Sequence, residues 1–187
     1  MRSFKKFGVL VGVLALSAIG AANASAAQFT YSATGTLSGK ATSTQVFTTN
    51  GGQIKCTTAA VSGTIKSIAT EEQTVEVKYS GCTAFGFVNT HITPAQYNVT
   101  ASGEVHPENT TTVTPTGAGC SITVGPQTIT KIVTSNTGFW IFKWTKQIHS
   151  MVYSSTGGLC GASGSNGTYT GTIEVERVGG GSASFDP

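Results

Sequence analysis

The chain carries little charge and almost no aspartate. Only 10% of its 187 residues are Asp, Glu, Lys or Arg, and Asp186, next to the last residue, is the one aspartate. This single, terminal aspartate excludes the usual serine–histidine–aspartate triad and a calcium loop of the EF-hand type. No cluster of Lys and Arg follows residue 26. A nucleic-acid partner, which needs such a cluster to displace counterions, is therefore excluded.

Long apolar runs are absent after residue 22, and the run before it is short. Residues 7–22 are apolar or small, they follow Arg2, Lys5 and Lys6, and Ala24-Ser25-Ala26 come next. A membrane-spanning helix needs about 20 apolar residues. The order of cations, short apolar run and small residues is instead typical of a secretory signal peptide cleaved after Ala26. We therefore expect an extracellular protein with no membrane attachment after cleavage.

Cleavage changes the charge and leaves enough chain for one domain. The whole sequence has 11 basic and 8 acidic residues, and the 3 basic residues of the signal peptide leave 8 of each. The mature chain is thus formally neutral. About 160 residues suffice for a single core. We expect a single β-sandwich domain over 27–178 and a flexible Gly/Ser-rich tail over 179–187.

Cysteines are few, and none is spaced for a metal site. Cys56, Cys82, Cys120 and Cys160 lie more than four residues apart, and no histidine stands at ligand spacing from any of them. Neither a metal nor a cofactor is expected. An even number of cysteines in an exported chain favours two disulfides, for which three pairings are possible.

Helical patterns are also missing, whereas strand patterns recur. Threonine, valine and glycine are abundant, and apolar residues alternate with polar ones, as in Val75, Val77 and Tyr79 or in Tyr169, Ile173 and Val175. Such alternation predicts strands with one buried face. Turn sequences separate the runs. The sequence predicts an all-β protein, an antiparallel β-sandwich or a flattened barrel of roughly ten short strands.

Residues 158–171 are the densest run of glycine and serine, but they match neither a phosphate-binding loop nor a nucleophile elbow. The run has no lysine for a phosphate-binding loop, and its G-A-S-G is one residue short of a nucleophile elbow. Asn166-Gly167 favours a hairpin turn before a strand. We expect a loop and turn beside Cys160, with no catalytic role.

One strip of aromatic residues has two interpretations. In a strand, Trp140, Phe142 and Trp144 project from the same face, so both tryptophans of the chain share it. This face belongs to the core, or it is a flat platform for sugar rings or another apolar ligand.

The residues around the cysteines resemble those of a known family. "IKCTTAAVSGT", "YSGCTAFGFVNT", "GAGCSITVGPQ" and "GLCG…GTYTGT" are similar to small secreted proteins of Gram-positive soil bacteria. The resemblance implies an exported, disulfide-bonded, all-β protein and no particular activity. Such proteins often carry a further cysteine pair between the positions of Cys82 and Cys120, which this chain lacks. The resemblance thereby implies the pairs Cys56–Cys82 and Cys120–Cys160.

Three functional hypotheses follow from the sequence. The first is a non-enzymatic extracellular binding or envelope-associated module, with polysaccharide or cell-envelope material as the partner. The second is a secreted glycoside hydrolase whose carboxylates are gathered in space; its candidate residues are Glu76, Glu104, Glu108, Glu174 and Glu176. The third is a carrier whose aromatic strip lines a cavity for a small apolar ligand.

Overall fold

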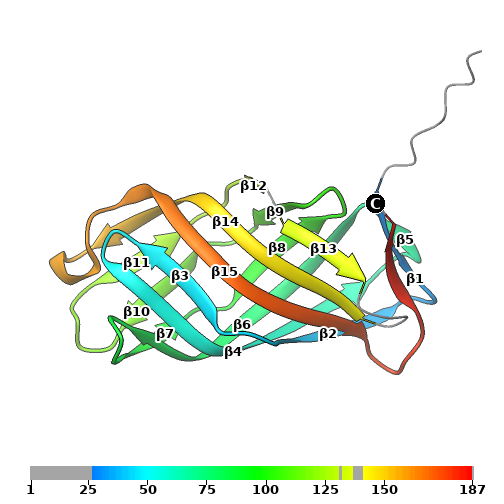
Figure 1. Cartoon of the computed structure of the whole chain (residues 1–187), viewed down its shortest axis with the longest axis horizontal. Helices are drawn as coiled ribbons and strands as arrows, with labels where there is room; N and C mark the ends of the chain where they lie inside the picture. The colour runs from blue at the N-terminus through cyan, green and yellow to red at the C-terminus, as the bar shows by residue number, and fades with distance from the viewer. Residues whose placement is uncertain (1–26, 131, 137–140, 187) are drawn as a thin grey trace, which may run out of the picture.

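The computed structural model describes residues 27–130, 132–136 and 141–186, and it describes side chains for 27–129 and 150–184. Within these residues the protein is all-β, as predicted, with sixteen strands, antiparallel pairing and one 3₁₀ turn, η1 (Gly158–Cys160) (Figure 1). One large sheet curves around a single interior, and a small sheet lies at one end. This arrangement fits a sandwich or flattened barrel.

Four long strands organise the large sheet. They are β4 (Gly52–Ile65), β6 (Glu72–Ala84), β14 (Ile141–Thr156) and β15 (Gly164–Arg177). β4 pairs with β6, and β14 pairs with β15, so that two long ribbons face each other across the interior. Each long strand has different partners along its two halves. The described strands therefore exceed the roughly ten short ones expected from the sequence, and four of them are long.

At one end the strands form a closed ring. The short strands here are β3 (Gln45–Thr49), β7 (Val88–Ile92), β10 (Thr111–Pro115) and β11 (Ser121–Val124). Hydrogen-bonded neighbours follow the order β15-β3-β4-β6-β7-β10-β11-β14 and return to β15. We call this part the disulfide half; it comprises residues 45–58, 80–93, 110–128 and 150–170.

The other end of the large sheet has its own set of short strands. They are β2 (Gly35–Ala41), β8 (Ala95–Thr100), β9 (Glu104–Pro107), β12 (Ile129–Thr130) and β13 (Ile132–Asn136). The order runs β13-β14-β15-β2-β4-β6-β8-β9-β12. We call this part the charged half; it comprises residues 28–41, 59–79, 95–108, 129–130, 132–136, 141–148 and 171–186.

The small sheet lies at the end of the charged half and uses both ends of the described chain (Figure 1). β1 (Gln28–Tyr31) pairs with β16 (Ala183–Asp186) and with β5 (Ala69–Thr70). The expected flexible tail is therefore wrong for residues 183–186. The backbone of this segment completes a sheet, and the Ala183 side chain is fully buried. The glycines at 179–181 all have positive φ and let the chain turn back to form it.

The two halves meet where the alternation of buried residues breaks. On β4 the buried residues are even-numbered up to Cys56 and odd-numbered from Ala59 onward. On β6 the same switch occurs between Tyr79 and Cys82. Gly81 has φ +60°, and a Cβ there would overlap the Thr57 hydroxyl. Thr57 and Gly81 lie opposite each other, so the buried side of both strands changes at the same level while their register stays the same.

The interior at this junction is filled by aromatic rings and a buried amide. Phe47, Tyr79 and Tyr169 pack with ring centroids 4.5–6.4 Å apart. Gln45 is fully buried; its amide nitrogen donates to the Ser43 carbonyl at 2.6 Å, and its oxygen accepts from the Tyr169 hydroxyl. The polar atoms of Gln45 are thus paired, as burial requires.

Both disulfides lie in the disulfide half. Cys56 and Cys82 are directly opposite each other on β4 and β6, and Cys120 joins the loop before β11 to Cys160 in η1. These are the same pairs that the family resemblance implied. Asn166-Gly167, expected to form a turn, lies inside β15 instead, and the connection runs through residues 157–163. A Cβ on Gly167 would come within 2.8 Å of the Met151 carbonyl, so the glycine serves close strand packing.

Candidate binding surfaces

The aromatic strip lies outside the residues whose side chains the structure describes. Trp140 is not described at all, and Phe142 and Trp144 are described only as backbone positions of β14. Their register partners on β15 are Val175 for Phe142 and Ile173 for Trp144. The interpretation of the strip as core or as ligand platform therefore stays as the sequence left it.

The candidate glutamates are spread over the outer surface of the charged half. Glu176 on β15 is opposite Ser38 on β2, and Ser38 is opposite Ser62 on β4. Ser62 is in turn opposite Glu76 on β6. Three strand spacings put Glu176 and Glu76 about 14 Å apart. The Glu76 carboxylate instead pairs with Lys78 at 2.9 Å. Carboxylates of a glycosidase lie about 5–10 Å apart, so these two do not form such a site.

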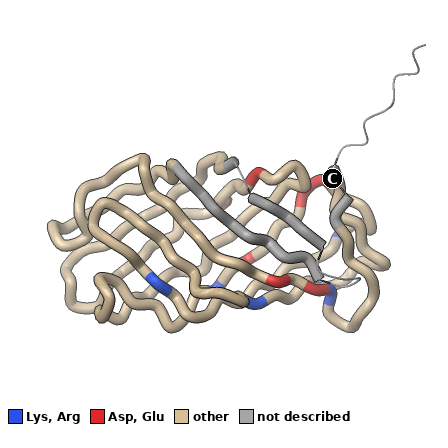
Figure 2. Tube along the Cα trace, in the orientation of Figure 1, with Lys and Arg blue, Asp and Glu red and all other residues tan. Residues whose placement is uncertain are grey.

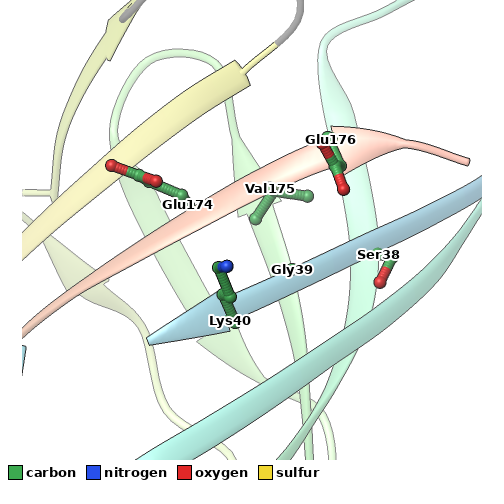
Figure 3. A pocket seen from close by; sticks show the side chains of 6 residues that line it. All are labelled: Ser38, Gly39, Lys40, Glu174, Val175 and Glu176. Atoms are coloured by element: carbon green, nitrogen blue, oxygen red, sulfur yellow. The ribbon is translucent and has the colours of Figure 1, made fainter. Parts of the chain in front are cut away.

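Glu174 and Glu176 do come together, beside a shallow furrow. The furrow has a volume of about 210 Å³, crosses β2 and β15, and lies between the pairs Lys40–Glu174 and Ser38–Glu176 (Figure 3). Two residues along one strand span roughly 7 Å. Both carboxylates thus project from the same strand, at a spacing that falls within the range of a glycosidase pair. The furrow is shallow and presents these two carboxylates to solvent beside Lys40.

Glu104 takes part in a chain of polar contacts that the sequence did not indicate. Its carboxylate lies 3.4 Å from His106 Nε2, and His106 Nδ1 lies 3.3 Å from the Thr128 hydroxyl. The order hydroxyl, imidazole, carboxylate is that of a nucleophile with its base. Both contacts are longer than usual for hydrogen bonds, and Thr128 is exposed on the outer face. The arrangement is a surface hydrogen-bond chain.

The loops at the far end of the disulfide half form a tightly packed rim. A Cβ on Gly51 would overlap the Cys160 carbonyl, and a Cβ on Gly161 would come within 2.6 Å of Gly51. The backbone N–H of Asn50 donates a hydrogen bond to the Tyr153 hydroxyl at 2.7 Å. Because Cys160 is bonded to Cys120, the turn at 50–51 and the loops 116–120 and 157–163 are tied together.

Two apolar side chains project from this rim into solvent. Phe87, in the turn between β6 and β7, is 82% exposed, and Leu159, in η1, is 67% exposed. The rim segments 50–51, 85–87, 116–120 and 157–163 contain no ionisable side chain apart from the bonded cysteines. This surface thus combines two exposed apolar side chains with an absence of charge. We call these four segments the loop rim.

The charge distribution separates this rim from the rest of the molecule (Figure 2). Within the described residues, all acidic side chains belong to the charged half, and Lys55 is the only Lys or Arg of the disulfide half. Sequence reasoning missed this surface because it considered charge over the whole chain. The missing signal is local: no acidic residue occurs between Glu108 and Glu174.

Buried tyrosines line the interior between the two halves. Burial raises the pKa of Tyr79, Tyr97 and Tyr169, and of Tyr31 beneath the small sheet, above the usual value of 10.0. The Tyr79 and Tyr97 hydroxyls lie 3.3 Å apart, and the Tyr31 hydroxyl donates to Gln73 at 3.1 Å. These hydroxyls stay protonated at neutral pH and act as packed hydrogen-bonding groups of the core.

Three further results bear on function. Over the described ranges, no three His, Cys, Asp or Glu residues gather as metal ligands. Nor does any helix in that part of the chain have the length and apolarity to cross a membrane. Comparison of the chain with protein-family models, curated proteins and solved structures found no match.

Proposed function

We propose that the protein is a secreted, non-enzymatic binding module whose loop rim attaches it to uncharged polysaccharide or cell-envelope material. The observation that carries this proposal is the loop rim itself, where Phe87 and Leu159 are exposed on a surface without charge. An aromatic side chain flanked by small polar residues offers a face for a sugar ring. The packed glycines and the Cys120–Cys160 bond keep the rim ordered, which lowers the entropy cost of binding.

The two disulfides fit an oxidising environment, and the signal-peptide pattern at residues 1–26 supports export. Expression of the full chain in a Gram-positive host tests this part. The expected product is in the culture medium and begins at Ala27. Its mass is about 4 Da below that of the reduced chain, because each of the two disulfides forms with the loss of two hydrogen atoms. A product retained in the cytoplasm with residue 1 intact would contradict export.

Binding is tested with the purified secreted chain and insoluble polymers, namely crystalline cellulose, chitin and a purified Gram-positive cell wall. The variant Phe87→Ser with Leu159→Ser removes the apolar groups of the rim. The control, Ile68→Ser with Val178→Ser, removes two apolar groups that are 60% and 52% exposed in the charged half. We expect the first variant to lose at least about tenfold in affinity, because its aromatic contact is lost, and the control to bind normally. Equal binding by all three proteins would contradict the proposal.

The same samples test the hydrolase hypothesis. Release of soluble sugar from any polymer, abolished by Glu174→Gln or Glu176→Gln, would show an enzyme that uses the furrow. We expect no release, because the furrow, at about 210 Å³, is smaller than an ordinary ligand site and would not enclose a sugar on each side of the bond.

A further inference from the structure

A patterned array of hydroxyl groups lies next to the loop rim. Along β10, β11 and β14, buried residues alternate with residues that carry hydroxyl groups. The buried residues, such as Val113, Ile122 and Tyr153, point inward. The hydroxyl residues between them point outward. We call them the hydroxyl face: Thr112, Thr114, Ser121, Thr123, Ser154 and Thr156.

The register arranges these six residues in two rows across three strands. Thr112 is opposite Thr123, which is opposite Ser154, and Ser121 is opposite Thr156. Thr114 extends the second row by one step of the same register. Neighbouring strands are about 4.8 Å apart, and alternate residues along a strand are about 7 Å apart. The hydroxyls therefore form a two-dimensional grid.

Hydrogen bonds within the rows fix the positions of the hydroxyls. The Ser121 and Thr156 hydroxyl oxygens are 2.9 Å apart, and those of Thr123 and Ser154 are 2.7 Å apart. Each hydroxyl combines one donor with two acceptor sites, so each pair keeps further capacity for a partner. Ser and Thr also have few rotamers to lose. The grid is thus held in place before anything binds.

The face carries no Asp, Glu, Lys or Arg, and His91, at the edge on β7, is its one ionisable neighbour. A charged polymer would lose hydration here without gaining an opposite charge. A single neutral sugar would gain little, because one hydroxyl contact is weak against water. Affinity requires many such contacts at once, and an ordered solid whose own hydroxyls repeat supplies them.

We propose that the hydroxyl face is a second binding surface that selects the ordered face of an insoluble, uncharged polysaccharide over its separate chains. This inference rests on the proposed binding function and names its ligand class. Chain continuity puts both surfaces at the same end of the molecule, since Phe87 directly precedes β7 and Leu159 follows β14 by three residues (Figure 1). The loop rim holds a chain end or edge, and the hydroxyl face lies on the solid.

The test variant is Thr112→Val, Thr114→Val and Thr123→Val, which removes three hydroxyls and keeps the β-branched shape. Its matched control is Thr36→Val, Thr64→Val and Thr74→Val, a row of exposed threonines across β2, β4 and β6 in the charged half. Circular dichroism and the urea midpoint confirm that both variants fold. Binding is measured by depletion from solution with crystalline cellulose or chitin, and with soluble oligosaccharides of the same sugars.

We expect the hydroxyl-face variant to lose about tenfold or more in partition onto the crystalline polymers, with the control unchanged, whereas the weak affinity of the loop rim for soluble oligosaccharides stays the same in both variants. If the loop-rim variant loses binding while the hydroxyl-face variant keeps it, the proposed function stands and this inference fails. If the unaltered protein binds no polymer, both fail. A shift from dimer to monomer in the hydroxyl-face variant, seen by light scattering, would show that a second copy covers the face. Inhibition of ice recrystallisation without polymer binding would show that the ordered partner is ice. Either result would overturn the inference.

Discussion

The two halves of the molecule share four long strands but are stabilised by different means. The disulfide half closes its ring of strands, contains both disulfides, and has Lys55 as its only Lys or Arg. The charged half contains no cysteine and includes the small sheet at its end. Its buried Gln73 and the guanidinium of Arg177 bind backbone carbonyls, Gln73 that of Thr74 at 2.8 Å and Arg177 that of Ala33 at 3.2 Å. Polar side-chain contacts serve both halves, and the two covalent bonds are added in the disulfide half alone.

This difference explains how the loop rim can be uncharged and rich in glycine while keeping one shape. Loops of this composition lose much backbone entropy when they are ordered. The Cys120–Cys160 bond removes part of that freedom from the unfolded chain as well. The charged half has regular strands and needs no such bond. The Cys120–Cys160 bond is therefore located where the sequence is least able to hold a structure by itself, whereas Cys56–Cys82 joins the paired strands β4 and β6.

Removal of the disulfides should break this comparison most strongly. Each bond closes a loop of 26 or 40 residues and contributes about 3–4 kcal/mol to stability in the chain-entropy description. We expect Cys120→Ser with Cys160→Ser to lower the free energy of unfolding by that amount, measured with urea. Hydrogen exchange should speed up first in residues 110–128 and 150–170, and much less in β2 and β8. Uniform loss of protection in both halves would contradict the division.

Alkaline pH should weaken the junction between the halves. The folded pKa values of Tyr31, Tyr79, Tyr97 and Tyr169 lie above 10.0, their usual value in an unfolded chain. The folded protein therefore keeps protons that the unfolded chain loses, so the stabilisation is complete below pH 10 and falls as the pH rises. Each tyrosine should cost about 1 kcal/mol between pH 9 and 11.

The measurement for this prediction is the urea midpoint at pH 8, 9, 10 and 11, followed together with tyrosinate absorbance near 295 nm. We expect most tyrosinate absorbance to appear only as the protein unfolds. Full ionisation near pH 10 in the folded state would show that these hydroxyls are not buried.

A smaller change at the junction tests whether the halves depend on each other. A Cβ on Gly171 of β15 would overlap the side-chain amide of Gln45, whereas a Cβ on Gly125 would meet no atom within 4 Å. Gly171→Ala should displace Gln45 from its bonds to Ser43 and Tyr169 and cost about 2 kcal/mol. Gly125→Ala, the control, should stay within about 0.5 kcal/mol of the unaltered protein. Urea unfolding of both variants measures these costs, and an equally small loss in both would show that the interior around Gln45 is not tightly packed.

Much of the fold could be predicted from the sequence because strand alternation is local. Tyr79 and Val75 are buried, and Lys78 is exposed, as their alternation indicated. β4 and β6 are longer than the short strands that the sequence indicated, because pairing continues past Thr57 and Gly81, where the alternation breaks. A break in the pattern resembles a strand end unless the partner strand is known to break at the same place. The strand at 183–186 was missed for a related reason, since its pairing with β1 spans the whole chain.

The candidate surfaces could be predicted less well, because they depend on which loops meet. Phe87 and Leu159 are 72 residues apart in the chain, and nothing near either one indicates that both belong to one rim. The hydroxyl face likewise needs the register of three strands. Glu174 and Glu176 could be placed on the outer face from alternation alone, and the structure confirms that Glu176 is exposed and Glu174 half-buried. Local pattern therefore predicts which way a residue faces but not its distant neighbours.

The charges of the charged half should matter least for stability. Lys78 and Glu76 form an ion pair at 2.9 Å, but the Lys78 side chain is 65% exposed, and water screens such a pair. We expect Lys78→Gln with Glu76→Gln to change the free energy of unfolding by less than about 0.5 kcal/mol, at both 20 mM and 500 mM salt. The double variant removes both charges, so that neither partner is left unpaired. A loss above about 1 kcal/mol would show that the charged half needs its surface charge to fold. A negligible loss would instead show that this half folds without its surface charges and that hydrogen bonds hold it together. The charges then serve to keep a formally neutral, hydroxyl-rich molecule in solution, while the uncharged end is free to bind.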